Sequence, residues 1–208
     1  MRGLTLLFVA SLAGASYASI INGGFESPAL GSGLYNTLTP AGWSSNGTSG
    51  VWNIPTGGFF AAEAPEGTQI GYSNGSVFAQ GNIGILAVDQ VTLSCMAGRR
   101  SDTFAGSFKM QLWAGGALNS SLVMVGGTLL GEAAFDHTSI APATFTPLSV
   151  VYTAPTSSSL IGQSLTVRLE KTVGSQMNFD DFRINAVPEP GSLAALAIGA
   201  LLLRARKK

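Results

Sequence analysis

Cysteine and histidine are almost absent from this 208-residue chain, which contains one of each, Cys95 and His137. A single cysteine excludes an intramolecular disulfide, so burial and hydrogen bonds, with a metal ion as a further option, have to hold the fold. We interpret Cys95 as a small buried apolar residue. One histidine without histidine or cysteine neighbours excludes the common zinc-binding patterns. We therefore interpret His137, which follows Asp136, as a solvated loop residue.

Charged residues are also scarce, at 11% of the chain. Between Ser19 and Val187 there are six basic and ten acidic side chains, a net charge of −4. A mildly acidic body offers no basic stripe for phosphate backbones, so we expect no nucleic-acid partner. Glycine, serine, threonine and asparagine fill the polar positions, which favours strands, turns and an extracellular surface over a helical cytosolic enzyme.

The N-terminus is typical of a secretory signal peptide. Arg2 precedes the apolar run 4–13, and the small residues Ser16-Tyr17-Ala18 follow it. This order of a basic residue, an apolar run and a small-residue cleavage site predicts a signal peptide over residues 1–18 and a mature chain that starts at Ser19. A buried N-terminal helix is the alternative interpretation.

The C-terminus consists of three blocks. Val187-Pro188-Glu189-Pro190 breaks regular structure, because each proline lacks an N–H and restricts the residue before it. The segment 192–203 is apolar, and four basic residues close the chain: Arg204, Arg206, Lys207 and Lys208. Twelve helical residues extend about 18 Å, short of a hydrocarbon core of about 30 Å. A helix packed on the protein is the alternative, but such a helix has a polar face and this segment has none.

This tail resembles the PEP-CTERM sorting signal of exported bacterial proteins. The resemblance implies export through the Sec translocon, transient insertion of the tail in the inner membrane, and cleavage near Pro188–Pro190 by an exosortase. It also implies a final place at the cell surface or in the extracellular matrix.

Period-two alternation predicts strands in the body of the chain. Val91, Leu93, Cys95 and Ala97 share one face of a strand, and Phe108, Met110 and Leu112 share one face of another. Leu165, Val167 and Leu169 repeat the pattern, and the period slips by one residue at Asp180-Asp181, which predicts a β-bulge. Asn74-Gly75 predicts a hairpin between Gln69–Tyr72 and Val77–Gln80, and Gly57–Ala61 is expected to be a short strand.

No sustained helical periodicity interrupts these strands. We therefore predict an all-β jelly-roll sandwich of roughly eight to ten antiparallel strands. It would occupy residues 19–186, between a signal helix at 1–18 and a short transmembrane helix in the sorting signal at 187–208.

A second resemblance supports this fold. The opening Ile20-x-Asn22-Gly23-x-Phe25-Glu26-x-Pro28, the pair Gly42-Trp43 and the closing segment 179–184 (Phe-Asp-Asp-Phe-Arg-Ile) are similar to the galactose-binding-like sandwich of carbohydrate-binding modules. The resemblance implies a structural calcium ion between the first and last strands, bound by Glu26 and by Asp180 or Asp181. Calcium prefers such oxygen ligands. The same acids could instead cap turns or pair with Arg183.

Aromatic residues are the candidates for ligand binding. Trp43, Trp52 and Tyr72 have polar neighbours in the sequence, and Trp113 falls on the outward face of its strand with Lys109 and Gln111. Such rings bind sugars, but they also fill sandwich cores, and both interpretations stay open here.

A catalytic centre is not evident. There is no Gly-x-Ser-x-Gly elbow for a serine nucleophile, and the spacing of the acids does not nominate a pair of glycosidase carboxylates. We therefore expect a non-enzymatic exported protein with a structural or adhesive role in a polysaccharide-rich matrix or biofilm. A carbohydrate-binding module with a defined glycan and an extracellular hydrolase are the alternatives.

Overall fold

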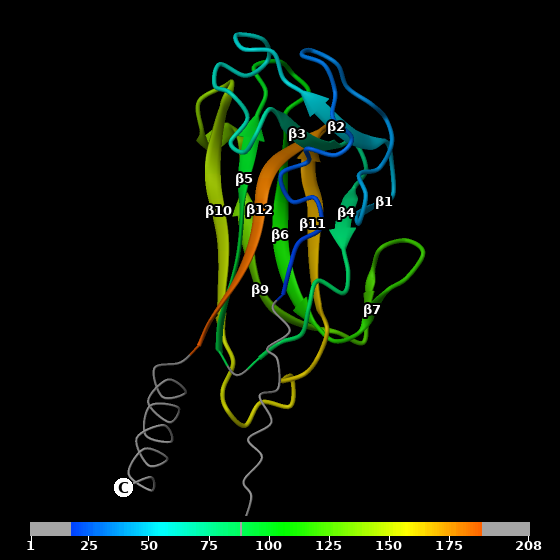
Figure 1. Ribbon diagram of the computed structural model, residues 1–208, viewed down its shortest axis with the longest axis vertical. Coiled ribbons are helices and arrows are strands. Elements are labelled where there is room, and N and C mark those ends of the chain that lie inside the picture. The colour runs from blue at the N-terminus through cyan, green and yellow to red at the C-terminus, as the bar shows by residue number, and fades with distance from the viewer. Residues whose placement is uncertain (1–17, 88, 189–208) are drawn as a thin grey trace, which may run out of the picture.

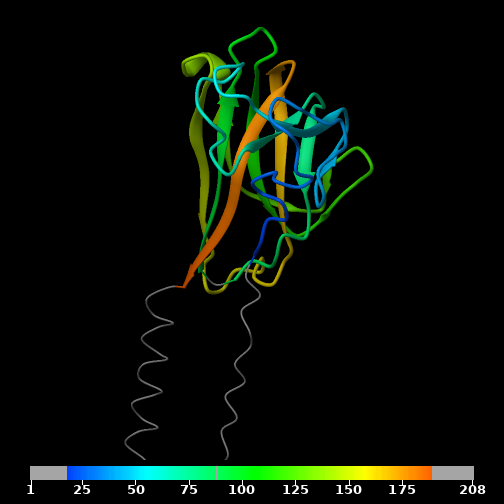
Figure 2. The same cartoon turned by 45° about the horizontal axis from the view of Figure 1, so that its top comes forward.

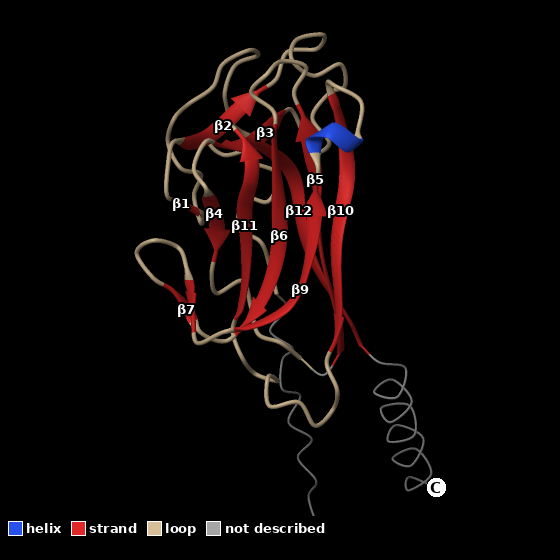
Figure 3. Cartoon of the chain, turned by 180° about the vertical axis from the view of Figure 1, so that it is seen from behind, coloured by secondary structure: helices blue, strands red, loops and turns tan. Residues whose placement is uncertain are grey.

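The computed structural model describes residues 18–87 and 89–188, which form two five-stranded antiparallel sheets packed face to face (Figure 1). The first sheet has the order β10-β5-β12-β3-β2, the second has the order β1-β4-β11-β6-β9, and β7 pairs with β8. The strands are β1 (Ser44–Ser45), β2 (Ser49–Asn53), β3 (Gln69–Ser73), β4 (Val77–Gln80), β5 (Asp89–Arg99), β6 (Gly106–Ala114), β7 (Ala117–Leu118), β8 (Met124–Val125), β9 (Thr128–Phe135), β10 (Thr144–Thr153), β11 (Leu165–Gly174) and β12 (Met177–Pro188). A 3₁₀ turn, η1 (His137–Ser139), precedes β10 (Figure 3). The predicted sandwich is confirmed, while residues 1–17 and 189–208, which hold most of the predicted signal helix and the tail helix, lie outside the described part.

The predicted alternation matches the core that fills the space between the two sheets. The inward residues of β5, β6 and β11 are all buried: Val91, Leu93, Cys95, Ala97, Phe108, Met110, Leu112, Leu165, Val167 and Leu169. Cys95 is among them, and its burial raises the pKa of the thiol, as expected of an inert core residue.

An aromatic cluster closes one side of this core. Phe25 and Phe179 contact each other, and both contact Phe78 and Phe182. The Trp43 ring stacks on Phe78 with centroids 4.7 Å apart and planes at 19°. These rings need room at β3, where Gly71 lies. A Cβ atom at that position would be 2.5 Å from Phe179 and 2.8 Å from Phe25, so a larger residue would displace the cluster.

The predicted bulge is confirmed. The pairing of β12 with β5 shifts register between Asp180 and Arg183, and Asp181 adopts a positive φ of 50°. The extra residue puts both Phe179 and Phe182 into the core, although three positions separate them in the sequence.

Two local predictions are wrong. Asn74-Gly75 does not close a hairpin, because β3 pairs with β2 and β12 in the first sheet while β4 pairs with β1 and β11 in the second. The turn carries the chain from one sheet to the other, and all residues of both strands are buried. The segment 57–61 is a loop, and its Phe60 fills a second apolar cluster outside the first sheet.

The two ends of the described chain, near Ala18 and Pro188, lie at the same end of the sandwich (Figures 1 and 2). The loops 54–68 and 100–105 lie at the opposite end, which we call the loop pole. β12 includes Val187 and Pro188, the first two residues of the predicted sorting motif, and Pro188 is the last residue that the structure describes. Within the described ranges, no helix is long and apolar enough to span a membrane.

Replacing Trp43, which is 6% exposed within the aromatic cluster, tests this packing. We expect Trp43→Ala to lower the free energy of unfolding by about 3–5 kcal/mol, because it removes a large buried ring and leaves a cavity. Urea titration followed by circular dichroism measures the change. Trp113→Ala, at a partly exposed ring, is the control and should cost less. A loss below about 1 kcal/mol for Trp43→Ala would contradict the core assignment.

Candidate functional site

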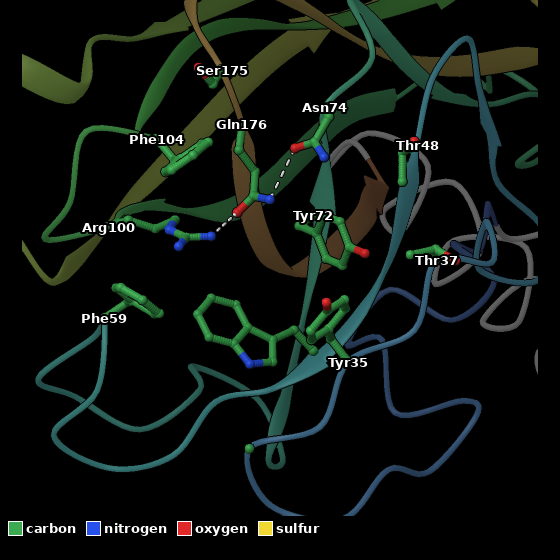
Figure 4. Close-up of a pocket in the computed structure, with 12 residues that line it drawn as sticks. Tyr35, Thr37, Thr48, Phe59, Tyr72, Asn74, Arg100, Phe104, Ser175 and Gln176 are labelled. Carbon is green, nitrogen blue, oxygen red and sulfur yellow. Dashed lines mark hydrogen bonds between the residues drawn. The ribbon is translucent and has the colours of Figure 1, made fainter.

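A cavity of about 600 Å³ opens at the loop pole, beside the outer face of the first sheet (Figure 4). One side of it is aromatic, and the remainder carries hydroxyls, amides and one guanidinium. The lining residues are Gly33, Tyr35, Thr37, Thr48, Trp52, Phe59, Tyr72, Asn74, Arg100, Phe104, Ser175 and Gln176. Cavities of this size and mixed character are typical of small-molecule sites.

The aromatic wall arises from strand alternation. In β3, Gly71 faces the core, so Ile70 and Tyr72 face outward, and Trp52 of β2 lies beside them. Loop residues Ile54 and Phe60 cover this face and complete a second apolar cluster. The cluster holds Trp52 and Tyr72 in place, while Phe59, Tyr35 and Phe104 stay 42%, 67% and 55% exposed around the cavity.

Arg100, directly after β5, lies among the rings of this wall. Its guanidinium carbon is 4.4 Å from the ring centroid of Phe59, 5.1 Å from that of Trp52 and 5.6 Å from that of Phe104. The side chain is 12% exposed, and Asp102 binds it through two hydrogen bonds of 3.0 and 2.7 Å. Cation–π contact and the paired carboxylate both stabilise a charge at this depth.

Gln176 and Asn74 extend these contacts across the cavity. Arg100 Nη1 donates to Gln176 Oε1 over 2.6 Å, and Gln176 Nε2 donates to Asn74 Oδ1 over 3.0 Å (Figure 4). The backbone N–H of Gln176 donates to Phe104 O over 2.8 Å, and the side chain is 8% exposed. The end of β5, the start of β12 and the turn after β3 are therefore tied together at the cavity.

The phenol of Tyr72 stays neutral at physiological pH. Burial raises its pKa, with a further contribution from Tyr35, and its hydroxyl donates to the carbonyl of Asn36. Because Asp102 balances Arg100, the cavity offers ring faces and hydrogen-bonding groups more than net charge.

The three tryptophans predicted as ligand-binding residues lie in different places. Trp52 lines the cavity. Trp43 is a core residue whose ring packs on Phe25, Phe78 and Phe182, so the expected ligand contact is corrected to a structural role. Trp113 lies on the outer face of the second sheet, as its strand phase predicts, and its Nε1 donates to Gln111 Oε1 over 3.2 Å.

Sequence reasoning did not single out Arg100, which follows directly after the alternating segment that ends at Arg99. The signal available was a charged residue at the end of an alternating strand in a chain with few charges. Its aromatic neighbours Phe59 and Trp52 come from distant segments, so the sequence could not show that they meet.

The predicted calcium ligands lie where the N-terminal segment meets the bulge of β12. The N–H of Phe182 donates to Gly23 O over 3.0 Å, which brings the two segments together. Glu26 accepts from the N–H groups of Thr68 and Gln69, and Asp181 accepts from Arg183. These contacts match the alternative of turn capping and pairing with Arg183.

Asp180 differs from its two neighbours. It is fully buried; Oδ2 accepts from the N–H of Glu66 over 2.8 Å, but Oδ1 has no hydrogen-bond partner. Burial raises the pKa of this carboxyl to about 8. In the part of the chain that the structure describes, no three histidine, cysteine or acidic side chains gather as a metal-binding group. A calcium ion here would therefore need backbone carbonyls as well.

His137 forms a structural contact at η1. Its Nδ1 lies 2.8 Å from Ser107 Oγ, which is itself the acceptor of the His137 N–H. Asp136 Oδ1 accepts from Ser107 and from Thr138, and the Thr138 bonds lower the pKa of this carboxyl. Ser107 is 4% exposed, and the carboxylate contacts the serine rather than the imidazole. The three side chains pin η1 onto β6 and do not have the geometry of a Ser-His-Asp triad.

Comparison with known proteins gives two family matches. The HpiC1-like family, described as HpiC1 cyclase, matches residues 16–185, and the PEP-CTERM protein-sorting motif matches residues 186–208. The sorting signal predicted from the tail is thereby confirmed. No curated protein sequence matches the chain.

Solved structures similar to this chain include two cyclases from Fischerella. The Stig cyclase Fisc from Fischerella sp. TAU, in complex with (3Z)-3-(1-methyl-2-pyrrolidinylidene)-3H-indole, is 25% identical, with a TM-score of 0.66 over 82% of this chain and 97% of that one. An apo cyclase from Fischerella sp. is 24% identical, with a TM-score of 0.67 over 84% and 98%. The CBM22-1 xylan-binding domain of Paenibacillus barcinonensis Xyn10C is more distant, at 16% identity and a TM-score of 0.45 over 76% and 98%.

Proposed function

The chain belongs to the HpiC1 cyclase-like family, and from this premise we propose that it is an exported protein that binds a small aromatic ring compound at its loop pole. Its PEP-CTERM motif marks it as exported. The observation that carries the proposal is the cavity of about 600 Å³, whose aromatic wall includes partly exposed phenylalanine and tyrosine rings. Large apolar side chains exposed together around a cavity are typical of a ligand site.

A flat bicyclic ligand suits this wall. Aromatic rings stack offset or meet edge to face, and Phe59, Phe104 and Tyr35 leave ring surface free for such contacts. The Stig cyclase Fisc was solved with a 3H-indole. Its likeness to this chain supports the same class of ligand here.

Binding, rather than ring closure, is the function that the geometry supports best. Arg100 is the charged residue among those that line the cavity, and Asp102 already pairs with it. Neither group is a free acid or base positioned against a ligand. The expectation that the protein is not an enzyme stays a prediction.

The pole arrangement supports a surface role. The sorting signal begins at the end of the sandwich opposite the cavity, so a tail held in the inner membrane would leave the cavity facing away from it (Figure 1). Processing by an exosortase, passage through the Sec translocon and an adhesive role in an extracellular matrix are part of this proposal.

Binding of 3,3-dimethyl-3H-indole tests the proposed function. We expect this compound to quench tryptophan fluorescence saturably, because Trp52 borders the cavity. Phe59→Ala removes a stacking wall and should weaken the affinity about tenfold, the equivalent of roughly 1.4 kcal/mol. Val151→Ala, at an exposed residue of β10, is the control and should leave the affinity unchanged. Equal affinity of the wild type and Phe59→Ala would contradict this assignment of the site.

Calcium is a second part of the proposal. Asp180 would bind it through the unpartnered Oδ1, and Glu66, whose N–H already contacts Asp180, would add a second carboxylate. When bound, the ion would supply the positive charge that a buried carboxylate lacks. It would stabilise the junction between the loop 63–68 and the bulge.

Stability against pH and calcium tests the role of Asp180. The folded pKa of about 8 exceeds the unfolded value of 3.8. Between these values the folded chain keeps a proton that the unfolded chain has lost, so stability falls as the pH rises, by up to about 1.4 kcal/mol per pH unit. In chelator we expect the Tm of the wild type to fall from pH 5 to pH 8 relative to that of Asp180→Asn.

Millimolar calcium at pH 8 should then raise the Tm of the wild type and leave that of Asp180→Asn unchanged. Glu132→Gln, at an exposed acid of β9, is the control for the loss of one carboxylate. A wild-type Tm that does not respond to calcium would rule out the ion.

Glycan binding is a second candidate function, favoured by the outer face of the second sheet. The partly exposed Trp113 lies there beside Gln111, which accepts a hydrogen bond from Arg168 over 2.8 Å. Arg168 in turn donates to Glu170, and Lys109 pairs with Glu132. A ring flanked by fixed polar groups is suited to a sugar.

Affinity electrophoresis in soluble xylan separates the two candidates. Glycan binding at this face predicts that the wild type and Phe59→Ala are retarded equally, while Trp113→Ala migrates freely because its stacking surface is gone. Retardation of Trp113→Ala to the same degree as the wild type would exclude this face as the glycan site.

A further inference from the structure

The amides at the cavity are held in one orientation by Arg100. A guanidinium can donate hydrogen bonds but cannot accept them. The Gln176 atom 2.6 Å from Arg100 Nη1 therefore has to be the amide oxygen. This leaves the amide nitrogen of Gln176 to face Asn74.

The amide of Asn74 is fixed in the same way. Because Gln176 Nε2 donates over 3.0 Å, the Asn74 atom that it meets has to be Oδ1. The Nδ2 group of Asn74, with its two hydrogens, is then left on the other side of the amide. Asn74 lines the cavity, and Figure 4 shows this nitrogen on the side of the amide that faces Tyr72.

The backbone of Asn74 is held as well. Its N–H donates to Thr48 O over 2.8 Å, and its carbonyl accepts from Lys171 Nζ over 2.7 Å. The next residue, Gly75, packs so closely that a Cβ atom there would lie 2.7 Å from Asn46 Oδ1 and 2.8 Å from Gly47 N. Asn74 is exposed. Its backbone contacts nevertheless fix the position of the residue, and the hydrogen bond from Gln176 fixes which end of the amide is the nitrogen.

The hydroxyls of Tyr35, Thr37, Thr48 and Ser175 select less sharply, because each can donate or accept a hydrogen bond, while the indole N–H of Trp52 can only donate. The hydroxyl of Tyr72 has committed its hydrogen to Asn36 O. Among these donors, Asn74 Nδ2 is the one that Arg100 orients through Gln176.

We infer that Asn74 determines the specificity of the cavity by requiring a hydrogen-bond acceptor on the ligand, such as an imine nitrogen, a carbonyl or an ether oxygen. A ligand that offers an N–H at this place would face another donor, and neither group would be satisfied. The inference rests on the proposed function and narrows its ligand class to aromatic ring compounds with an acceptor at one edge.

The ligand of the Stig cyclase Fisc has this chemistry. It is a 3H-indole joined to an N-methylated pyrrolidine ring. Neither nitrogen of such a compound carries a hydrogen, so both lack a donor.

A matched pair of compounds tests the inference. 3,3-Dimethyl-3H-indole and 3,3-dimethylindoline have the same size and shape, but the ring nitrogen is an acceptor in the first and carries a hydrogen in the second. By fluorescence titration at pH 8, we expect the wild type to bind the 3H-indole at least tenfold more tightly.

Two substitutions should reverse this preference. Asn74→Asp keeps an acceptor for Gln176 and presents a second oxygen to the cavity. Gln176→Glu has no donor for Asn74, so the amide of Asn74 has to turn and present Oδ1 instead. Reversal by Gln176→Glu would be specific to this chain of hydrogen bonds, because a loss of packing alone would weaken both compounds. Asn185→Asp, at an exposed residue near the other end of β12, controls for the added charge.

The outcomes separate this inference from the proposed function. If both compounds bind the wild type equally and neither substitution changes their ratio, the inference is wrong and the aromatic site stands. If neither compound binds the wild type, the proposed function fails and the inference fails with it. A preference for the 3H-indole that both substitutions reverse supports both.

Discussion

The bulge in β12 is the constraint on which the rest of the structure depends. β12 lies at the centre of the first sheet, between β5 and β3, so its two faces belong to different parts of the molecule. One extra residue at Asp180-Asp181 lets both Phe179 and Phe182 enter the core. Upstream of the bulge, Met177 and Phe179 face the core, so the residues that alternate with them, Asn178 and Asp180, face the outer side of the sheet. Gln176 precedes the strand and lines the cavity. The same strand therefore closes the core and supports the candidate site.

The core was predictable because it follows a local rule. Alternation placed Leu93, Met110 and Val167 inside, and the slip of phase at Asp180 predicted the bulge. The hairpin predicted at Asn74-Gly75 was wrong because this dipeptide indicates a tight turn but carries no information about which strands the flanking segments pair with. Every residue of β3 and β4 is buried, and each strand lies in a different sheet. Packing between the sheets therefore decided the pairing of these strands, and the local turn signal did not.

The candidate site was predictable in part. Trp52 was named as a ligand-binding residue, but Trp43 and Trp52 could not be told apart, because the core and the loop pole both use aromatic rings. Arg100 was missed for a related reason. Its surroundings come from the loop at Phe59, the turn at Asn74 and the start of β12, and no local pattern reports that these segments meet.

In a domain with few charges, Arg100 lies among aromatic rings and orients the side-chain amides of Gln176 and Asn74. This arrangement supports the proposal that the chain, an exported member of the HpiC1 cyclase-like family, binds ring compounds at the loop pole. Chemical-shift mapping of the isotope-labelled domain during titration with 3,3-dimethyl-3H-indole tests this proposal most directly. If the compound binds at the loop pole, the perturbed amides gather at residues 33–37, 57–60, 72–75, 100–104 and 174–176. Perturbations confined to the outer face of β6 and β11, or to no single region, would contradict it.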